Sequence, residues 1–475
     1  MRPDKVVIIG AGPAGLTLGL KLSEAKIPVE IIEADDRVGG LCKTLHYQGC
    51  SFDLGGHRFI TKDKQTQGFL EQLMGGDLLL RPRKSIICLK NKKINYPVNA
   101  KDIVGKLGFK FASRAFLDYL LTSALQRLYP RLDSSFEQWM INRYGVTLYN
   151  FYFGPYSEKL WGIKPCQISH QWAEQRIMLL NLGDVVARML WKKGNNPSTY
   201  AHQFYYPKAG IGQISEKMAE KIVALGGVIR VSSVLNAVNS SQDRISSVSY
   251  KTSDGSVKES KGEYIVNTAP LPYFIKLLAH DDNGYAEEAT RNNYYRSIRF
   301  MHVCLDIPSV SDNTWIYVPD AEVIFFRIQE LRNWSPTIVP EGKTALTLEI
   351  ACNYNDTIWK MPEDELWGLC YKGLSRLGLL KEDKVLWHFS SYARHAYPMY
   401  GLDYAKNVNK MYAYISRIKN LRCIGRQGLF RYNNMDHSIK MGLLTAEHLL
   451  DGYPFAEVMK IATERAIFDW QDPGK

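Results

Sequence analysis

Several signatures of well-known enzyme classes and of membrane proteins are missing from this sequence. Its eight cysteines form no C-x-x-C pair, which argues against a disulfide framework and a zinc site and favours a reducing cytoplasm as the location. No H-E-x-x-H, G-x-S-x-G or P-loop motif occurs, so these hydrolase and nucleotidase classes are not indicated and we expect no metal site. No apolar run approaches the roughly 20 residues of a membrane span.

Positive charge is in excess over the 475 residues. The chain carries 60 Lys and Arg against 48 Asp and Glu, a formal net charge of +12. The plainest interpretation is a solvated basic surface, and the functional one is attraction of an anionic substrate. No nucleic-acid-binding signature accompanies this charge. The predicted helical stretch 103–128 mixes phenylalanines and leucines with Lys and Arg. We expect it to face the core, and the alternative is peripheral contact with an acidic membrane, at its inner face.

The clearest local pattern is a dinucleotide-binding turn near the N-terminus. Val6–Ile9 is a continuous apolar run, as in a buried parallel strand, and a G-x-G-x-x-G turn follows. The first glycine permits the tight turn, the second lets the backbone approach a pyrophosphate, and the third lets the helix pack on the strand. A second strand, Val29–Ile32, ends at an acid that can bind a ribose hydroxyl. The predicted cofactor residues are Gly10, Gly12, Pro13, Ala14, Gly15 and Glu33.

A second glycine motif selects FAD as the cofactor. Arg37, Gly39 and Gly40 belong to an R-x-G-G-x-x-x-T run directly after the acid. This run resembles the second phosphate loop of flavoproteins in the amine-oxidase and glutathione-reductase superfamilies. The paired glycines allow close backbone approach, and Arg37 can offset phosphate charge.

Other candidate site residues are spread along the chain. Gly56 and His57 stand in a glycine-rich segment, where His57 either touches the flavin edge or closes a turn. Residues 154–162 are predicted to form a mobile loop, in which Trp161 either stacks on a nucleobase or lies in the core. Arg327 is expected on the buried side of a strand, where it needs an anion from the protein or from a ligand.

These patterns predict an α/β fold with a discontinuous Rossmann-like FAD-binding domain, a mainly helical domain and an antiparallel β-sheet domain. The FAD-binding domain is expected to comprise residues 1–80, 205–290 and 395–475, and the helical domain residues 100–195, with a helix from 136 capped by Asp133 or Ser134. The sheet domain comprises 81–99 and 291–394, with strands at 301–305, 315–318, 323–328 and 345–350. A C-terminal helix is expected at 439–450. Its N-terminus can stabilise negative charge on a reduced flavin.

Four segments together resemble the UDP-galactopyranose mutase family, within the wider amine-oxidase and protoporphyrinogen-oxidase superfamily. GGHRF is similar to the family's histidine loop beside the flavin, and YSEKLWG to its mobile segment Y-x-x-K-x-W-G. FFRIQE is similar to the strand that carries its substrate-phosphate arginine, and GRQGLFRYNNMDHS to its C-terminal flavin and pyrophosphate motif. The first and last segments are most similar to the eukaryotic-type mutases.

The resemblance assigns a role to each matching residue. It implies that Tyr156 and Trp161 meet the uridine and that Arg176 and Arg327 clamp the diphosphate from two sides. Tyr397 and Tyr432 would bond the diphosphate oxygens, with Asn434 close by. The residues implied to hold or support the flavin are His57, Arg426, Asp436, His437 and Ser438, and those on which catalysis would depend are His57, Arg176 and Arg327.

The function implied is a flavin-dependent nucleotide-sugar mutase, an isomerase that interconverts UDP-galactopyranose and UDP-galactofuranose or a close analogue for cell-surface glycan biosynthesis. In that family reduced FAD forms an N5–sugar adduct without net redox change, and NAD(P)H is a candidate external reductant. The protein then mainly positions the nucleotide sugar. The alternative is an FAD-dependent oxidase or dehydrogenase of the protoporphyrinogen-oxidase or amine-oxidase type, because the fold is shared. Oligomerisation is left open.

Overall fold

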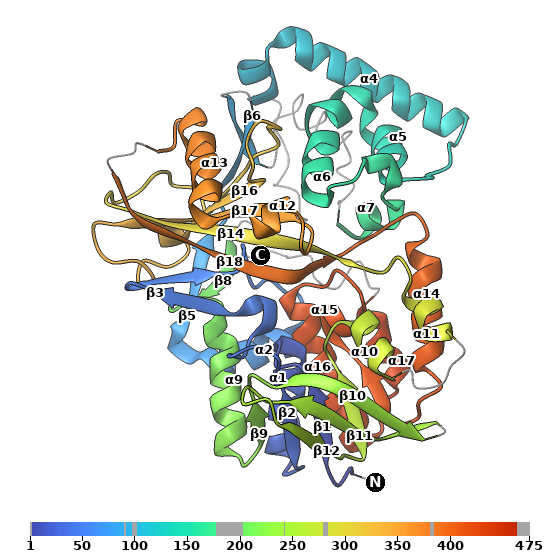
Figure 1. Cartoon of the computed structure of the whole chain (residues 1–475). Coiled ribbons are helices and arrows are strands. Elements are labelled where there is room, and N and C mark those ends of the chain that lie inside the picture. Colours follow the sequence, from blue (N-terminus) through green and yellow to red (C-terminus); the bar gives the residue numbers. More distant parts are fainter. Residues whose placement is uncertain are drawn as a thin grey trace.

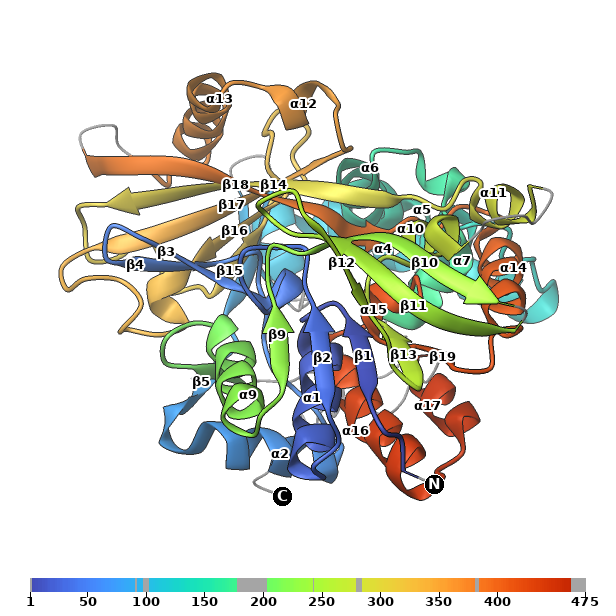
Figure 2. The same ribbon diagram turned by 60° about the horizontal axis from the view of Figure 1, so that its bottom comes forward.

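The nucleotide-binding part of the chain is built on a five-stranded parallel sheet with the strand order β19-β13-β1-β2-β9. The computed structural model describes residues 2–89, 92–96, 102–176, 203–241, 243–278, 284–380 and 384–462. Figure 2 shows the strands of this sheet side by side. They come from three distant stretches of the chain: β1 (Val6–Ile9), β2 (Val29–Ile32), β9 (Val228–Arg230), β13 (Tyr264–Asn267) and β19 (Leu421–Cys423).

Three helices pack together beside this sheet. Helix α1 (Pro13–Glu24) contacts both α9 (Gly212–Ala224) and α16 (Met435–Asp451). The contact with α16 is close because Gly442 has no side chain: a Cβ there would lie 2.7 Å from the Cβ of Thr17. A three-stranded antiparallel sheet completes this part, with β10 (Val234–Ser241), β11 (Arg244–Lys251) and β12 (Val257–Ser260).

A seven-stranded sheet crosses the middle of the molecule (Figure 1). Its order is β18-β14-β17-β16-β15-β6-β7, and all neighbouring strands are antiparallel except β15 and β6. Apolar residues of α13 (Glu363–Arg376) cover one face and form a second core with the strands. The strands are β6 (Ser85–Leu89), β7 (Lys92–Tyr96), β14 (Tyr295–Leu305), β15 (Trp315–Tyr317), β16 (Arg327–Glu330), β17 (Thr344–Cys352) and β18 (Val385–Pro398).

Smaller elements connect these layers. Two two-stranded sheets pair β3 (Thr44–Tyr47) with β4 (Cys50–Asp53) and β5 (Leu78–Pro82) with β8 (Gln203–Pro207). The remaining helices are α2 (Lys64–Met74), α10 (Leu271–Leu278), α11 (Tyr285–Thr290), α12 (Thr357–Lys360), α14 (Tyr404–Ile415), α15 (Gly425–Gly428) and α17 (Phe455–Ile461). Short helical turns are η1 (Gly40–Cys42), η2 (Gly75–Asp77), η5 (Pro165–Gln167) and η6 (Leu331–Asn333).

The helical part lies above the seven-stranded sheet in the view of Figure 1. It contains η3 (Ile103–Leu107), α4 (Phe109–Leu128), α5 (Phe136–Leu148), η4 (Tyr149–Phe153), α6 (Gly154–Trp161) and α7 (His170–Arg176). The prediction of a core-facing helix over 103–128 is wrong, because Gly108 interrupts it at φ +92° and Ala115 is the only buried residue described in α4. The predicted cap of α5 is also wrong. Ser135 accepts the N–H of Gln138, while Asp133 binds Arg143.

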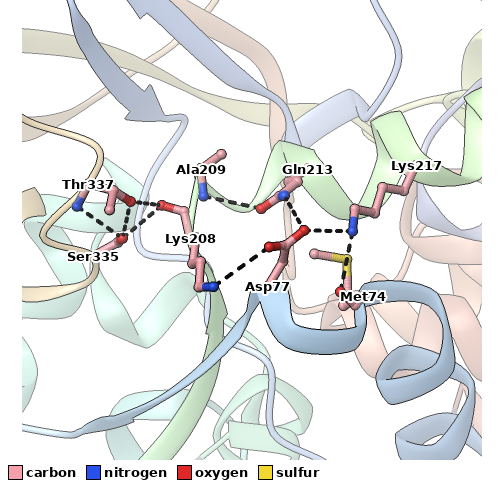
Figure 3. A network of polar contacts seen from close by, with 8 residues as sticks. All are labelled: Met74, Asp77, Lys208, Ala209, Gln213, Lys217, Ser335 and Thr337. Carbon is pink, nitrogen blue, oxygen red and sulfur yellow. Dashed lines mark hydrogen bonds and ion pairs between the residues drawn. The ribbon is translucent and has the colours of Figure 1, made fainter.

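A polar network joins the nucleotide-binding part to the sheet (Figure 3). The carboxylate of Asp77, in η2, accepts hydrogen bonds from Gln213 and Lys217 of α9 and lies 3.8 Å from the Nζ of Lys208. The backbone carbonyl of Lys208 in turn accepts from the hydroxyls of Ser335 and Thr337, at 2.7 Å each. These contacts connect segments far apart in sequence. They join helix α9 of the nucleotide-binding part to Ser335 and Thr337, which lie in the sequence between strands β16 and β17 of the seven-stranded sheet.

The α/β fold class with its nucleotide-binding, helical and antiparallel parts is confirmed. Strand β18 was not predicted, and only the end of the expected strand 323–328 belongs to β16. The C-terminal helix begins at Met435 instead of 439, so Asp436 lies in its first turn. The domain boundaries stay a prediction, and residues 177–195 and 463–475 lie outside the described residues.

Glu30 in β2 gives the parallel sheet a pH-dependent contribution to stability. Burial raises the pKa of its carboxyl, but hydrogen bonds from Lys5, Ser260 and Arg230 outweigh burial and bring the pKa to about 2. Because the folded-state value lies below the ordinary 4.5, the stabilisation is complete above about pH 4.5 and is lost as the pH falls through about 2.

We therefore expect Glu30→Gln to lower the free energy of unfolding at neutral pH by about 3 kcal/mol. The difference from the parent should shrink as the pH falls toward 2. Denaturant unfolding at a series of pH values measures both. The control is Glu24→Gln, which breaks an exposed pair with Lys21 and should change stability by only a few tenths of a kcal/mol. Equal effects of the two variants would contradict the assignment.

Candidate active site

The first glycine turn has an open side and a packed side. Gly10 adopts φ +99°, and a Cβ there would lie 2.4 Å from the Oγ1 of Thr268. A Cβ at Gly15 would lie 2.2 Å from the carbonyl oxygen of Gly10, so helix and strand approach closely. Among the described residues, a Cβ at Gly12 would meet nothing within 4 Å. The first and third glycines therefore serve the backbone, and Gly12 faces space that a ligand can occupy.

Glu33 lies against this turn. Its Oε2 accepts the N–H of Ala11 at 2.6 Å, and its Oε1 accepts the N–H of Asp35 at 2.9 Å. Burial raises the pKa of the carboxyl. The acid is thus held beside the glycine turn, where the ribose contact predicted from the sequence stays a prediction.

The second glycine loop touches the first. The N–H of Gly39, at φ +110°, donates to the carbonyl of Ala11 at 2.8 Å, and a Cβ at Gly40 would lie 3.5 Å from the Cα of Gly12. The Arg37 side chain is exposed and pairs with Asp36 at 3.0 Å. Its charge is therefore already offset by a protein carboxylate, and its predicted contact with a phosphate stays a prediction.

His57 carries a buried ring nitrogen that lacks a protein partner. Its backbone N–H donates to the carbonyl of Gly55 at 2.9 Å, which orients the loop, while its Nδ1 has no hydrogen-bond partner among the described residues. Burial, with the positive charges of Arg426 and Arg327 adding to it, lowers the pKa of His57 to about 3. The imidazole is therefore neutral at ordinary pH and can accept or donate one hydrogen bond to a ligand.

Because of this low pKa, His57 should cause no step in the pH dependence of FAD affinity near neutrality. The charged form is disfavoured in the fold, so FAD affinity measured by flavin fluorescence should show no inflection from His57 between about pH 5 and pH 8. His57→Gln should lower the affinity about tenfold through the lost hydrogen bond, with an unchanged profile shape. A step near pH 6.5 in the parent that disappears in His57→Gln would contradict this.

Arg426 and two tyrosines form a stacked group. The rings of Tyr397 and Tyr432 are 5.1 Å apart and nearly parallel, and the guanidinium of Arg426 lies 4.1 Å from the centre of the Tyr432 ring. Arg426 donates to the backbone carbonyls of Asn433 and Ala396. Its Nε is buried without a hydrogen-bond partner in the described part of the chain. Arg426 thus brings a positive charge that no carboxylate among the described residues neutralises.

The N-terminal turn of α16 adds polar groups. Asn434 precedes the helix, Asp436 and Ser438 lie in its first turn, and His437 contacts the carboxylate of Asp436 at 3.2 Å. The Oδ2 of Asp436 and the Nδ2 of Asn433 are buried and have no hydrogen-bond partner among the residues described. Unpaired buried atoms of this kind can bind a polar ligand.

Arg327 has its anion within the protein. Its Nε and Nη2 donate to both carboxylate oxygens of Glu349 at 2.6 Å, and Gln329 donates to the same carboxylate. Of the two partners weighed from the sequence, the structure therefore supplies the protein carboxylate. The Nη1 group is not used in this pair, so a diphosphate contact stays a prediction. Glu349 also lies 3.6 Å from the position of a Cβ on Gly55, next to the His57 loop.

Of the predicted loop 154–162, Gly154–Trp161 form helix α6, and Gly162 follows the helix end. Pro155 occupies the start of the helix and Gly162, at φ +67°, its end; proline and glycine at these places delimit a helix. Tyr156 stacks on Tyr152 at 5.4 Å and approaches Phe326 of the Arg327 segment at 6.2 Å. Trp161 is 1% exposed and meets Tyr397 edge-to-face at 5.9 Å, so it lies in the core in this arrangement.

The structure thus brings together His57, Arg327, Arg426 and the aromatic residues Tyr156, Trp161, Tyr397 and Tyr432. Arg176 is the last residue of α7, and its side chain lies outside the described residues. Whether it faces Arg327 across a substrate stays a prediction.

Several further residues that hold this site were not predicted from the sequence. Glu349 and Gln329 orient Arg327, as described above. Arg296, buried in β14, donates to the carbonyl of Leu160 at 3.0 Å and so binds the end of α6. Lys159 of α6 donates to the carbonyls of Val318 and Asp320, and burial lowers its pKa to about 7. A charged residue inside a mostly apolar strand, as with Glu349 in β17, was the available signal.

These observations fit a bound FAD. The open space at Gly12, the contact between the two glycine loops and the unpaired Nδ1 of His57 are what a dinucleotide and its flavin ring require. The residues that would hold it are those of the two loops, Glu33, His57 and the first turn of α16. In the described part of the chain, no three His, Cys, Asp or Glu side chains are grouped to hold a metal.

Comparison with known proteins identifies a family and several relatives with assigned names. The model of the flavin containing amine oxidoreductase family matches residues 13–407. A probable UDP-galactopyranose mutase of Klebsiella pneumoniae is 20% identical over 479 residues, which covers 98% of this chain and 99% of that protein.

Solved structures agree with this fold. A crystal structure of reduced UDP-galactopyranose mutase matches with a TM-score of 0.80 and 22% identity, covering 97% of each chain. A putrescine oxidase bound to putrescine matches with a TM-score of 0.61 and 17% identity, over 94% of this chain and 98% of that one. Mutase and oxidase relatives thus share the fold. None of the helices described combines the length and the apolar character needed to cross a membrane.

Proposed function

Because this chain belongs to the flavin containing amine oxidoreductase family, we propose that it is an FAD-dependent mutase that interconverts the pyranose and furanose forms of a UDP-sugar, UDP-galactose or a close analogue. The proposal is supported by the likeness to UDP-galactopyranose mutases over nearly the whole chain. It makes the enzyme an intramolecular transferase that serves glycan biosynthesis, with NAD(P)H as a candidate reductant.

The single observation that carries the proposal is the charge and hydroxyl content of the site. Arg327 is paired with the carboxylate of Glu349, whereas Arg426 donates to backbone carbonyls and has no carboxylate partner in the described part of the chain. The site therefore offers one guanidinium, that of Arg426, which no carboxylate among the described residues pairs with, and burial holds the phenols of Tyr156 and Tyr397 protonated by raising their pKa values. A diphosphate supplies the negative charge and the several acceptor oxygens that such a site can bind. An apolar substrate supplies neither.

In this proposal the protein positions the substrate and does little acid–base chemistry. Arg327 and the tyrosines hold UDP in place while the sugar is rearranged, and Arg176 is proposed to complete this clamp. His57 is neutral and supports the flavin without taking up or releasing a proton. Reduced FAD, when bound, supplies the electron pair for bond exchange at the sugar carbon and is recovered unchanged.

The test is an isomerisation assay with purified protein under nitrogen. Protein reduced with dithionite is incubated with UDP-galactose and related UDP-sugars, oxidised protein serves as the control, and isomers are separated by chromatography. A new isomer formed only by the reduced protein is the expected result. No isomer from any UDP-sugar, together with no UDP binding, would overturn the proposal.

The second candidate is an amine oxidase or dehydrogenase, which the likeness to putrescine oxidase supports. It predicts that an amine reduces the oxidised flavin anaerobically and that oxygen is then consumed. The mutase proposal predicts neither, so stopped-flow spectra of the oxidised flavin with amines and with UDP-sugars distinguish the two.

A further inference from the structure

Helix α4 turns an apolar face away from the protein. Figure 1 shows it along the upper edge of the molecule, next to α5. Its exposed apolar side chains include Phe109 at 77%, Leu121 at 63% and Leu128 at 72%, and Leu132 just beyond the helix is 89% exposed. The further members of this face are Val104, Phe116, Leu117, Leu120, Leu125 and Tyr129. We call these ten residues the α4 face.

Residues outside the α4 face hold the helix on the molecule: Phe111 packs on Phe151 with ring centres 5.0 Å apart, Ala115 is buried, and Asp118 accepts the N–H of Thr147 at 2.6 Å. A Cβ at Gly145 would lie 2.7 Å from the carboxylate of Asp118, which shows how closely α4 and α5 approach. Most of the large apolar residues of α4 thus point outward, whereas Phe111, Ala115 and Asp118 face the protein, which differs from an ordinary surface helix.

Apart from one inward-facing acid, the charged residues of the segment 103–132 are all basic. Between residues 103 and 132 the only acid is Asp118, and it faces inward on Thr147. The basic residues of the same stretch are Lys106, Lys110, Arg114, Arg127 and Arg131. The exposed ones among them stand between the apolar side chains, and their long stems can extend along an apolar surface to reach anionic groups.

We propose that the α4 face docks on a lipid bilayer with anionic headgroups. Only a partner that offers hydrocarbon and negative charge in adjacent layers matches both the leucines and the basic residues of this face. A second copy packed on the same face about a two-fold axis would bring these basic residues against their own equivalents, with no acid to offset them. Nucleic acid offers the phosphates but no hydrocarbon for the leucines.

The experiment uses the full chain with bound FAD and two kinds of vesicle. One is phosphatidylcholine alone, and the other contains phosphatidylglycerol as well. In co-sedimentation we expect binding to the anionic vesicles about tenfold or more above that to the neutral ones, falling with added salt. Leu117→Gln combined with Leu121→Gln should reduce binding about tenfold or more, because both side chains would otherwise enter the apolar layer. Lys110→Gln combined with Arg114→Gln should remove most of the preference for anionic lipid.

The matched control is Val223→Gln combined with Leu225→Gln, two exposed apolar residues at the end of α9, far from α4 in sequence. It should bind vesicles as the parent does. All variants should keep the parent's FAD content and melting temperature. Binding of the parent to neither vesicle, or an equal loss in the control, would overturn the proposal. The proposal would also be overturned if the parent bound no vesicles but formed a dimer in analytical ultracentrifugation, and if the Leu117→Gln, Leu121→Gln variant were a monomer.

Discussion

Removing the positive charge of Arg327 is expected to weaken UDP binding about a hundredfold, the effect of losing a charge-assisted hydrogen bond to a phosphate. Alanine at this position would also leave the Glu349 carboxylate buried and unpaired, which costs stability. The informative variant is therefore Arg327→Gln combined with Glu349→Gln, in which two neutral amides replace the ion pair. Isothermal titration with UDP measures the affinity.

The single variant Glu349→Gln is the control for this prediction. It keeps the guanidinium and removes the carboxylate that competes with the diphosphate for it. UDP should therefore bind as tightly as in the parent or more tightly. If the double variant binds UDP as well as the parent, or if Glu349→Gln alone loses binding to the same extent as the double variant, Arg327 is not part of a diphosphate clamp.

A valine at Gly12 should remove FAD without unfolding the protein. Gly12 has φ −78° and ψ 177°, an extended conformation that valine adopts readily, and a Cβ there would meet no atom of the described residues within 4 Å. The added methyl groups would stand where the pyrophosphate approaches, so we expect about a hundredfold or greater loss of FAD affinity, about 2.7 kcal/mol. Flavin absorbance of the purified protein and titration of the apoprotein measure it.

Two further glycine variants separate ligand loss from fold loss. Gly15→Val should lose both FAD and thermal stability, since its Cβ would lie 2.2 Å from the Gly10 carbonyl oxygen. Gly68→Val, on the exposed side of α2 with nothing within 4 Å, should keep the parent's FAD affinity. A Gly12→Val protein that retains yellow colour and normal FAD affinity would contradict the cofactor placement.

The nucleotide-binding part was predictable from the sequence because its signals are local. Glycines with a required backbone conformation and continuous apolar runs determine β1, the turn and α1 with little help from the rest of the chain. Strand β18 gave no such signal. Polar and apolar residues do not alternate regularly along it, and it is a strand because it pairs along its length with β14. The outward face of α4 could not be predicted either, since an apolar stripe alone does not tell which side of a helix is covered.

The candidate site shows the same division. His57, Arg426 and Tyr432 stand in recognisable motifs, and the structure brings them together with Arg327. The pairing of Arg327 with Glu349 depends on the register of β16 against β17, in which the two residues are direct partners. Register is a property of the folded sheet, so the sequence left open whether the partner was protein or ligand. The prolines and glycines around α6 suggested a loop, although at those positions they begin and end a helix.

The measurement that tests the central claim most directly counts product molecules per flavin after a single reduction. The protein is reduced with one equivalent of dithionite under nitrogen, excess UDP-galactofuranose or its analogue is added, and product and flavin spectrum are followed together. The account predicts many turnovers per flavin while the spectrum stays that of reduced FAD. Product limited to one molecule per flavin, or reoxidation of the flavin by the substrate, would show net redox chemistry and contradict the mutase proposal.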